Sequence, residues 1–147
     1  MVNRRGLLSG VAAAAATLLS GCGIGRGNVL AATEEAAAGV EGVSGAELEL
    51  ADGANFERLL HGTVTLDVED RASGLAIFDE VTRGVVTVIH AELDDAEARS
   101  LRVGGITAVL GGGDELTPLD LDPDVPGEKP RRDRVTAESF YEKYGLS

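Results

Sequence analysis

The clearest pattern in the chain is a period of two in its hydrophobic and polar positions over two short stretches. In residues 46–50, an alanine and two leucines alternate with two glutamates, and in residues 62–68 three aliphatic side chains alternate with two threonines and an aspartate. Such alternation is typical of strands with one buried and one wet face. The residues between the two stretches include Asp52 and Gly53, which favour turns. The pattern therefore predicts two half-buried strands, at 46–50 and 62–68.

Three helices are predicted, the first two of them from apolar residues at helical spacing. The first covers residues 28–38, and the second covers residues 73–83, with Ser73 as its N-cap and Gly84 as its stop. The third is a short acidic helix at 94–101. Together with the strands, these helices indicate a chain that mixes both kinds of secondary structure.

Two further strands are expected. Residues 85–93 are rich in β-branched side chains, and residues 106–110 are aliphatic and framed by glycines. The order of elements predicts an α+β fold over residues 29–113, a two-layer sandwich in which a mostly antiparallel sheet has helices on one face and a wet opposite face. The pattern resembles ferredoxin-like domains begun one element late, over residues 28–110.

The C-terminal part of the chain differs in character. Residues 114–135 contain all four prolines together with acidic side chains, which predicts a loop or linker without packed structure. Residues 136–147 are expected to form a short helical segment carrying Phe140, Tyr141 and Tyr144. We expect this segment to dock on the core of the domain, and a peptide-like handle for a partner protein is the alternative.

The N-terminus has the organisation of an export signal. Arg4 and Arg5 precede an apolar run over residues 7–19, whose helical length of about 20 Å is too short to cross a hydrocarbon core of roughly 30 Å. A run of this length after a basic region is typical of a signal peptide. The run ends in Leu19-Ser20-Gly21-Cys22. This motif resembles the lipobox of bacterial lipoproteins, in which two small residues precede a cysteine that is lipidated.

The resemblance to bacterial lipoproteins implies an address for the protein. Residues 1–21 would be a signal peptide, Cys22 would carry the lipid, and residues 22–28 would tether the domain to the extracytoplasmic face of the cell membrane. Two or more acyl chains bind a bilayer stably. Residues 3–8 resemble a twin-arginine signal, and the general secretory route is the alternative. The domain itself is similar only in a loose way to small lipoproteins of high-GC Gram-positive bacteria without assigned function.

The charge of the chain restricts its partners. The formal net charge is −12, and the part beyond residue 21 has eleven basic and 25 acidic residues, a formal charge of −14. Binding of nucleic acid depends on lysine and arginine neutralising phosphates, so this balance argues against a nucleic-acid partner. It also argues against the domain lying flat on an anionic lipid surface. Solubility and mutual repulsion are the simplest consequences of the charge.

Two groups of side chains are candidate cation sites. Asp120, Asp122 and Asp124 alternate as in calcium loops, although Val125 and Arg131 stand where such a loop needs glycine and glutamate. A solvated acidic loop is the alternative.

The histidines are the second candidate. His61 and His90 would approach each other if the strands predicted at 62–68 and 85–93 paired, and could then share a metal with Glu92 or Asp67. Ordinary polar strand positions are the alternative reading.

No motif for catalysis is found in the sequence. A Gly-x-Ser-x-Gly elbow is absent, and Ser44 and Ser139 have no evident base. We therefore expect no cofactor and no enzymatic activity. The leading hypothesis is a membrane-anchored, non-catalytic binding or adaptor domain with an envelope protein as its possible partner. The alternative hypothesis is a cation- or metal-binding lipoprotein.

Overall fold

The computed structural model describes residues 26–52, 58–125, 129 and 131–146. A four-stranded sheet forms one layer, in the spatial order β1-β2-β3-β4. β1 pairs with β2 and β3 with β4 in antiparallel fashion, whereas β2 and β3 are parallel. The strands are β1 (Val43–Asp52), β2 (Arg58–Leu66), β3 (Arg102–Val109) and β4 (Glu115–Leu116).

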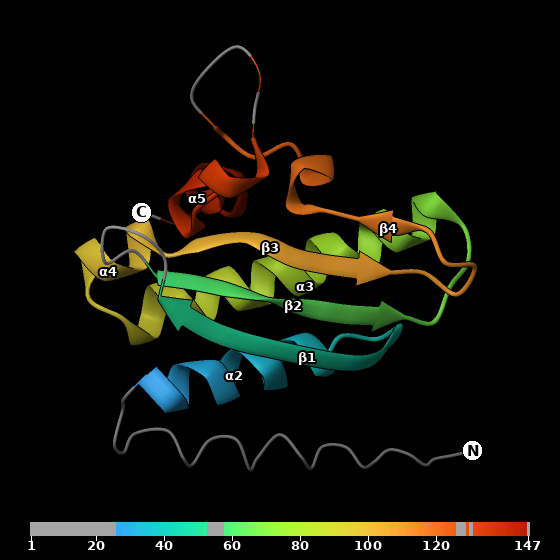
Figure 1. Cartoon of the computed structure of the whole chain (residues 1–147), viewed down its shortest axis with the longest axis horizontal. Helices are drawn as coiled ribbons and strands as arrows, with labels where there is room; N and C mark the ends of the chain where they lie inside the picture. Colours follow the sequence, from blue (N-terminus) through green and yellow to red (C-terminus); the bar gives the residue numbers. More distant parts are fainter. Residues whose placement is uncertain (1–25, 53–57, 126–128, 130, 147) are drawn as a thin grey trace.

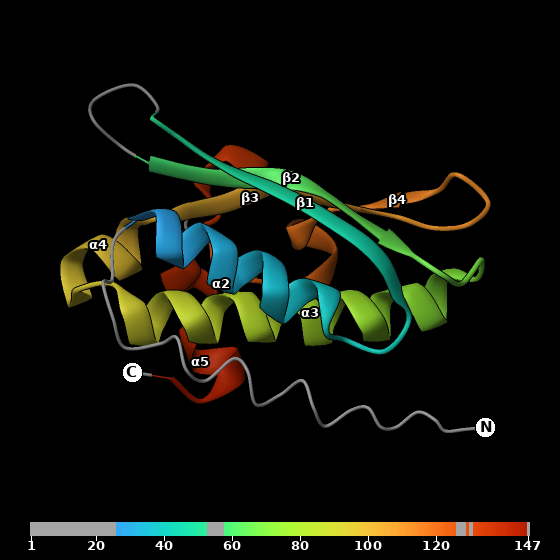
Figure 2. The ribbon, with the colours of Figure 1, turned by 90° about the horizontal axis from the view of Figure 1, so that it is seen from below.

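The helices α2 (Arg26–Ala38) and α3 (Arg71–Glu92) lie on the same side of the sheet, as Figures 1 and 2 show. The short helix α4 (Asp95–Ser100) follows α3 and leads into β3. Among the described residues, the opposite face of the sheet carries no α-helix. The predicted two-layer α+β sandwich with a mostly antiparallel sheet is therefore confirmed.

The alternation in the sequence locates the two sides of β1 and β2 correctly. Leu48 and Val64 are buried toward the helices, and Glu47 and Thr63 are exposed on the other face. Both strands start earlier than predicted, and β2 ends at Leu66 instead of reaching residue 68. The core between sheet and helices is aliphatic with one large aromatic side chain from α3; its members include Leu48, Leu60, Val64, Phe78, Val81, Val85, Ile89, Val103 and Ile106.

The strand predicted at 85–93 is wrong, because residues 85–92 lie in the second half of α3 and Leu93 is its C-cap. Gly84 does not stop the helix but lies inside it against α2, where an added Cβ would be 3.6 Å from the Cβ of Ala36. The apolar residues on both sides of Gly84 form one stripe at spacings of three and four, which is the period of a helix and not of a strand. The N-cap is Asp70, whose carboxylate accepts from the backbone N–H of Ser73 at 2.8 Å.

The connection from β2 through α3 and α4 joins two neighbouring strands. β2 and β3 hydrogen-bond to each other directly, with His61 opposite Gly105 and Val64 opposite Ala108. The ferredoxin-like resemblance concerned the order of helices and strands along the chain. In space, the four strands of this sheet lie side by side in the order in which they occur in the chain. This arrangement places His61 next to a pair of glycines on β3.

The prediction that residues 114–135 lack packed structure is wrong for a large part of the segment. It contains β4 and the 3₁₀ helices η2 (Pro118–Leu121) and η3 (Arg132–Arg134). Leu116, Leu121 and Val135 are buried in the core. Pro118 begins η2 and Pro123 follows its end, so these two prolines border a packed element.

The C-terminal segment consists of η4 (Ala137–Phe140) and α5 (Tyr141–Tyr144). Phe140 and Tyr141 are buried, and the ring of Phe140 stacks on that of Tyr144 with centroids 5.6 Å apart. The expected docking of this segment on the core is thus confirmed.

Candidate functional site

The sheet face opposite α2 and α3, which we call the open face, carries no α-helix among the described residues. Figure 1 looks onto this face, with α3 behind the strands. Since side chains alternate along each strand, the open face receives those between the buried positions. These are Glu47 and Glu49 of β1, His61, Thr63 and Thr65 of β2, and Gly105 and Thr107 of β3.

A hollow of about 440 Å³ lies on the β3 side of the open face. Its floor is the backbone of Gly104 and Gly105, which have no side chains to fill it. An added Cβ on Gly105 would lie only 2.8 Å from the Cβ of His61, on the neighbouring strand. The residues that line the hollow are Leu59, His61, Arg102, Gly104, Gly105, Arg132 and Asp133.

The wall formed by Arg132 depends on a close approach between two backbones. The N–H of Val103 donates to the carbonyl of Val135 at 3.0 Å, so that residues 132–135 run along the edge of β3. A Cβ on Gly104 would lie 1.8 Å from the carbonyl oxygen of Arg132, which only glycine tolerates. The Arg132 side chain then turns back over the sheet, and its Nε donates to the Gly104 carbonyl at 2.6 Å.

The guanidinium of Arg132 also donates to the hydroxyl of Thr107, so that two contacts fix its plane beside the glycine floor. Arg102 and His61 stand around the same floor. The carboxylate of Asp133 is engaged by Arg131, at 3.1 Å. Guanidinium groups bind carboxylates and phosphates through paired N–H donors. The hollow is therefore a basic recess in a chain of net charge −12.

The β1 side of the open face has the opposite charge. Glu47 and Glu49 are exposed there, and Glu49 lies 3.9 Å from the Nε2 of His61. The open face thus changes from acidic over β1 to basic over β3, with His61 between them. This division is the main electrostatic feature of the face.

The two histidines do not share a site. His61 lies on β2, whereas His90 lies on α3 in the helical layer, where its ring meets that of Tyr141 edge-on at 5.1 Å. The paired strands that would have joined the histidines do not exist, because the second of them is helical. Within the part of the chain that the structure describes, no three histidine, cysteine or carboxylate side chains gather as metal ligands.

The three alternating aspartates do not form a calcium loop either. Asp120 accepts from the backbone N–H of Thr117 at 2.8 Å and pairs with Arg71 at 2.9 Å, so it caps η2 and ties it to α3. Asp122 has a left-handed backbone with φ of 62°. The backbone N–H of Asp124 donates to the carbonyl of Ser139 at 2.9 Å. These contacts fix the segment against the C-terminal elements.

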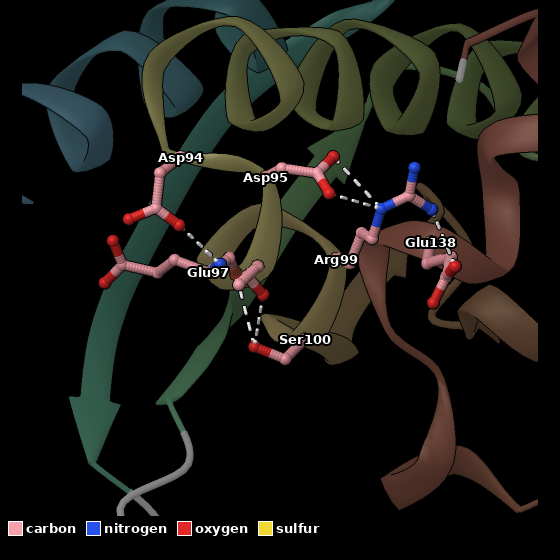
Figure 3. A network of polar contacts seen from close by, with 7 residues as sticks. Asp94, Asp95, Glu97, Arg99, Ser100 and Glu138 are labelled. Atoms are coloured by element: carbon pink, nitrogen blue, oxygen red, sulfur yellow. Dashed lines mark hydrogen bonds and ion pairs between the residues drawn. The ribbon is translucent and has the colours of Figure 1, made fainter.

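A second polar network, shown in Figure 3, has a structural role. The Nε of Arg99 pairs with Asp95 at 3.0 Å and its Nη1 with Glu138 at 2.7 Å, which links α4 to η4. The hydrogen bonds that Arg99 donates to Asp95 and Glu138 raise the pKa of Arg99. Asp94 caps α4 by accepting from the N–H of Glu97 at 2.8 Å. A permanently charged guanidinium held by two carboxylates positions the C-terminal segment and offers no group for proton transfer.

The remaining residues singled out by the sequence do not form a catalytic group. The hydroxyl of Ser44 donates to the carbonyl of Thr65 at 3.3 Å, and that of Ser139 accepts from the N–H of Thr136 at 3.0 Å. Cys22, the predicted lipidation site, lies outside the described residues, as does the predicted signal peptide. Among the described residues, no helix has both the length and the apolar character needed to span a bilayer.

Sequence reasoning missed the hollow, because its residues come from three separate segments. The one local signal was the pair Gly104-Gly105 at the start of β3, where glycine in a strand marks a close approach of another backbone or a ligand. Comparison with known proteins adds no assignment: the chain matches no known protein family, no curated protein and no solved structure.

Proposed function

We propose that the protein is a lipid-anchored binding protein of the extracytoplasmic face of the cell membrane, which holds an anionic group of an envelope partner in the hollow of its open face. The observation that carries the proposal is the basic recess between His61, Arg102 and Arg132 over a floor of two glycines. The lipobox at Cys22 supports the anchor.

The chemistry of the hollow favours a carboxylate or phosphate over a cation. Arg132 is held in place by Gly104 and Thr107, so its remaining N–H donors are preorganised and less side-chain entropy is lost on binding. The acidic charge elsewhere repels anions from the rest of the surface, which restricts their binding to this recess. The cation-binding alternative gains no support, because His61 and His90 lie in different layers.

The anchor is tested by expressing the wild-type protein and the Cys22→Ala variant in a bacterial host and comparing their location and mass. The wild type should fractionate with membranes, and its mass should equal that of residues 22–147 plus the lipid on Cys22. Cys22→Ala should show neither property. A wild-type protein of unprocessed, unlipidated mass would contradict the anchor.

The hollow is tested separately, by titrating the full-length protein with succinate and with inorganic phosphate while following backbone amide resonances. We expect saturable shifts at Gly104 and Gly105 that disappear in Arg132→Gln. Arg134→Gln is the matched control, since Arg134 lies two residues further along η3, is exposed and lies outside the hollow. Equal loss in both variants, or shifts spread over all exposed arginines, would contradict a specific site.

A further inference from the structure

The outer edge of β1, on the side away from β2, is a second candidate binding surface. It lies apart from the hollow, which is on the β3 side of the open face. Among the described residues, β1 is the terminal strand of the sheet and pairs with β2 along one side only. At the other end of the sheet, β3 is flanked by β4 and by residues 135–136. An unpaired strand edge is a template for the addition of another strand.

One hydrogen bond identifies which backbone groups of β1 point outward. The N–H of Leu48 donates to the Oε2 of Glu34 on α2, at 2.8 Å, and so it points away from β2. The pairing with β2 is regular from Gly45 to Asp52, and in an antiparallel pair the N–H groups point alternately toward and away from the partner strand. The N–H groups of Ala46 and Leu50 therefore point outward as well.

Glu34 occupies the position where an added strand would place a backbone carbonyl. Its carboxylate oxygen accepts from an outward N–H of β1, as the carbonyl of a neighbouring strand would do. The carboxylate belongs to a half-buried side chain on α2, which packs beside and beneath this edge (Figure 2). Of the residues that the structure describes, an incoming strand has to displace the Glu34 side chain and no backbone segment.

Charge decides which strand fits. Glu47 and Glu49 are exposed beside this edge, and Glu34 lies on its helical side. A second copy of β1 added antiparallel would bring these glutamates close to their own counterparts, and like charges on neighbouring strands are destabilising. A segment with lysine or arginine at every second position would instead face Glu47 and Glu49, with its other side chains above α2.

We propose that β1 binds an extended basic segment of a partner protein as an added strand, with Glu34 as the group that it displaces from Leu48. The regular part of β1 from Gly45 to Asp52 spans about 27 Å, which matches a peptide of about eight residues. The proposal does not depend on the lipid anchor or on the hollow, so the succinate and phosphate titrations can fail while it holds.

The first test concerns the edge itself and needs no ligand. In the full-length protein, amide hydrogen exchange should be slower at Leu48 than at Ala46 and Leu50, because Leu48 alone of the three has Glu34 as acceptor. Glu34→Ala should raise the exchange rate of Leu48 to that of its two neighbours. Glu35→Ala is the matched control, since Glu35 is exposed on the same helix. An unchanged rate at Leu48 in Glu34→Ala would overturn the assignment of the outward N–H groups.

The second test uses a capped synthetic peptide of eight residues that alternates lysine with valine. We expect saturable binding to the full-length protein, with new exchange protection at Ala46 and Leu50 and affinity at least tenfold lower for Glu47→Gln/Glu49→Gln. A peptide in which glutamate replaces lysine should not bind, and N-methylation of alternate backbone nitrogens should lower the affinity at least tenfold. Equal binding of the N-methylated peptide, absence of binding by the lysine peptide, or equal binding of the glutamate peptide would each overturn the proposal.

Discussion

Tyr141 and Tyr144 allow a sharp prediction, because the same chemical change should have opposite effects at two positions three residues apart. Tyr141 is 4% exposed, and its buried hydroxyl has no hydrogen-bond partner among the described residues. Its ring meets His90 edge-on and lies 5.3 Å below the guanidinium carbon of Arg99. Phenylalanine keeps both ring contacts and removes only the unpaired hydroxyl.

The magnitudes follow from the cost of an unpaired polar group. A buried hydroxyl without a partner costs about 1–3 kcal/mol, so Tyr141→Phe should raise the free energy of unfolding by about 1 kcal/mol. At Tyr144 the hydroxyl donates to the carboxylate of Asp79 at 2.7 Å. Because hydrogen bonds to charged groups contribute about 1.5–3 kcal/mol, Tyr144→Phe should lower the free energy of unfolding by about 1.5 kcal/mol.

Urea denaturation followed by far-ultraviolet circular dichroism measures both effects. The dependence of free energy on urea should be unchanged in both variants, so that the midpoints alone report stability. In thermal melts, each kcal/mol corresponds to about 4 °C in a domain of this size. A free energy of unfolding lowered in Tyr141→Phe by about 0.5 kcal/mol or more, on the order of half a hydrogen bond, would refute the reasoning. It would mean that the hydroxyl of Tyr141 has a hydrogen-bond partner in the wild-type protein.

Three further predictions follow from single features of the fold. Gly84→Ala should stabilise the protein by up to about 1 kcal/mol in urea melts, since α3 continues through Gly84 with room for a methyl group, whereas a loss would mean that the helix breaks there. Gly104→Ala should destabilise the protein by more than about 2 kcal/mol, because the new Cβ would clash with the carbonyl of Arg132. Gly112→Ala is the control and should change the urea midpoint little, since Gly112 has open space around it. Equal effects of the two substitutions would contradict the close approach at Gly104. Burial and the hydrogen bond to a carboxylate raise the pKa of Tyr144, so the unfolded chain loses this proton near pH 10 while the folded protein retains it. The free energy of unfolding should therefore fall above about pH 10, and it should fall less steeply in Tyr144→Phe. Identical slopes of the two proteins in this pH range would contradict the prediction.

The sequence was sufficient for β1 and β2 because a period of two has one simple interpretation in a half-buried sheet. It was insufficient for residues 85–93, where β-branched residues and a preceding glycine favour a strand locally. The same residues continue the stripe of Phe78 and Val81 at helical spacing, and packing of that stripe on the sheet decides the outcome. Counting the spacing across Gly84 would have favoured one long helix.

The hollow could not be predicted for a different reason. His61 and Arg102 come together because β2 and β3 are parallel neighbours, with His61 opposite Gly105. The helices α3 and α4 separate the two strands along the chain, and no local pattern in either strand specifies their relative register. Arg132 comes from a segment whose prolines indicate irregular structure but not its position along β3. Only the glycine pair gave a local indication of crowding.

The two edges of the sheet are protected to very different degrees, and this difference is informative. The outer side of β3 is covered by β4, by residues 132–136 and by the side chain of Arg132. Glycine at position 104 lets the backbone of residue 132 approach β3 closely. Along β1, the described part of the chain supplies the carboxylate of Glu34, which accepts from one outward N–H group. Proteins normally blunt an exposed edge with charge or cover it with backbone, because an open edge invites aggregation. The glutamates of β1 would repel those of a second copy, whereas a basic strand would meet complementary charge at the same edge. Selective exclusion of its own copies, without a permanent backbone cover, is the behaviour expected of a strand kept available for a partner.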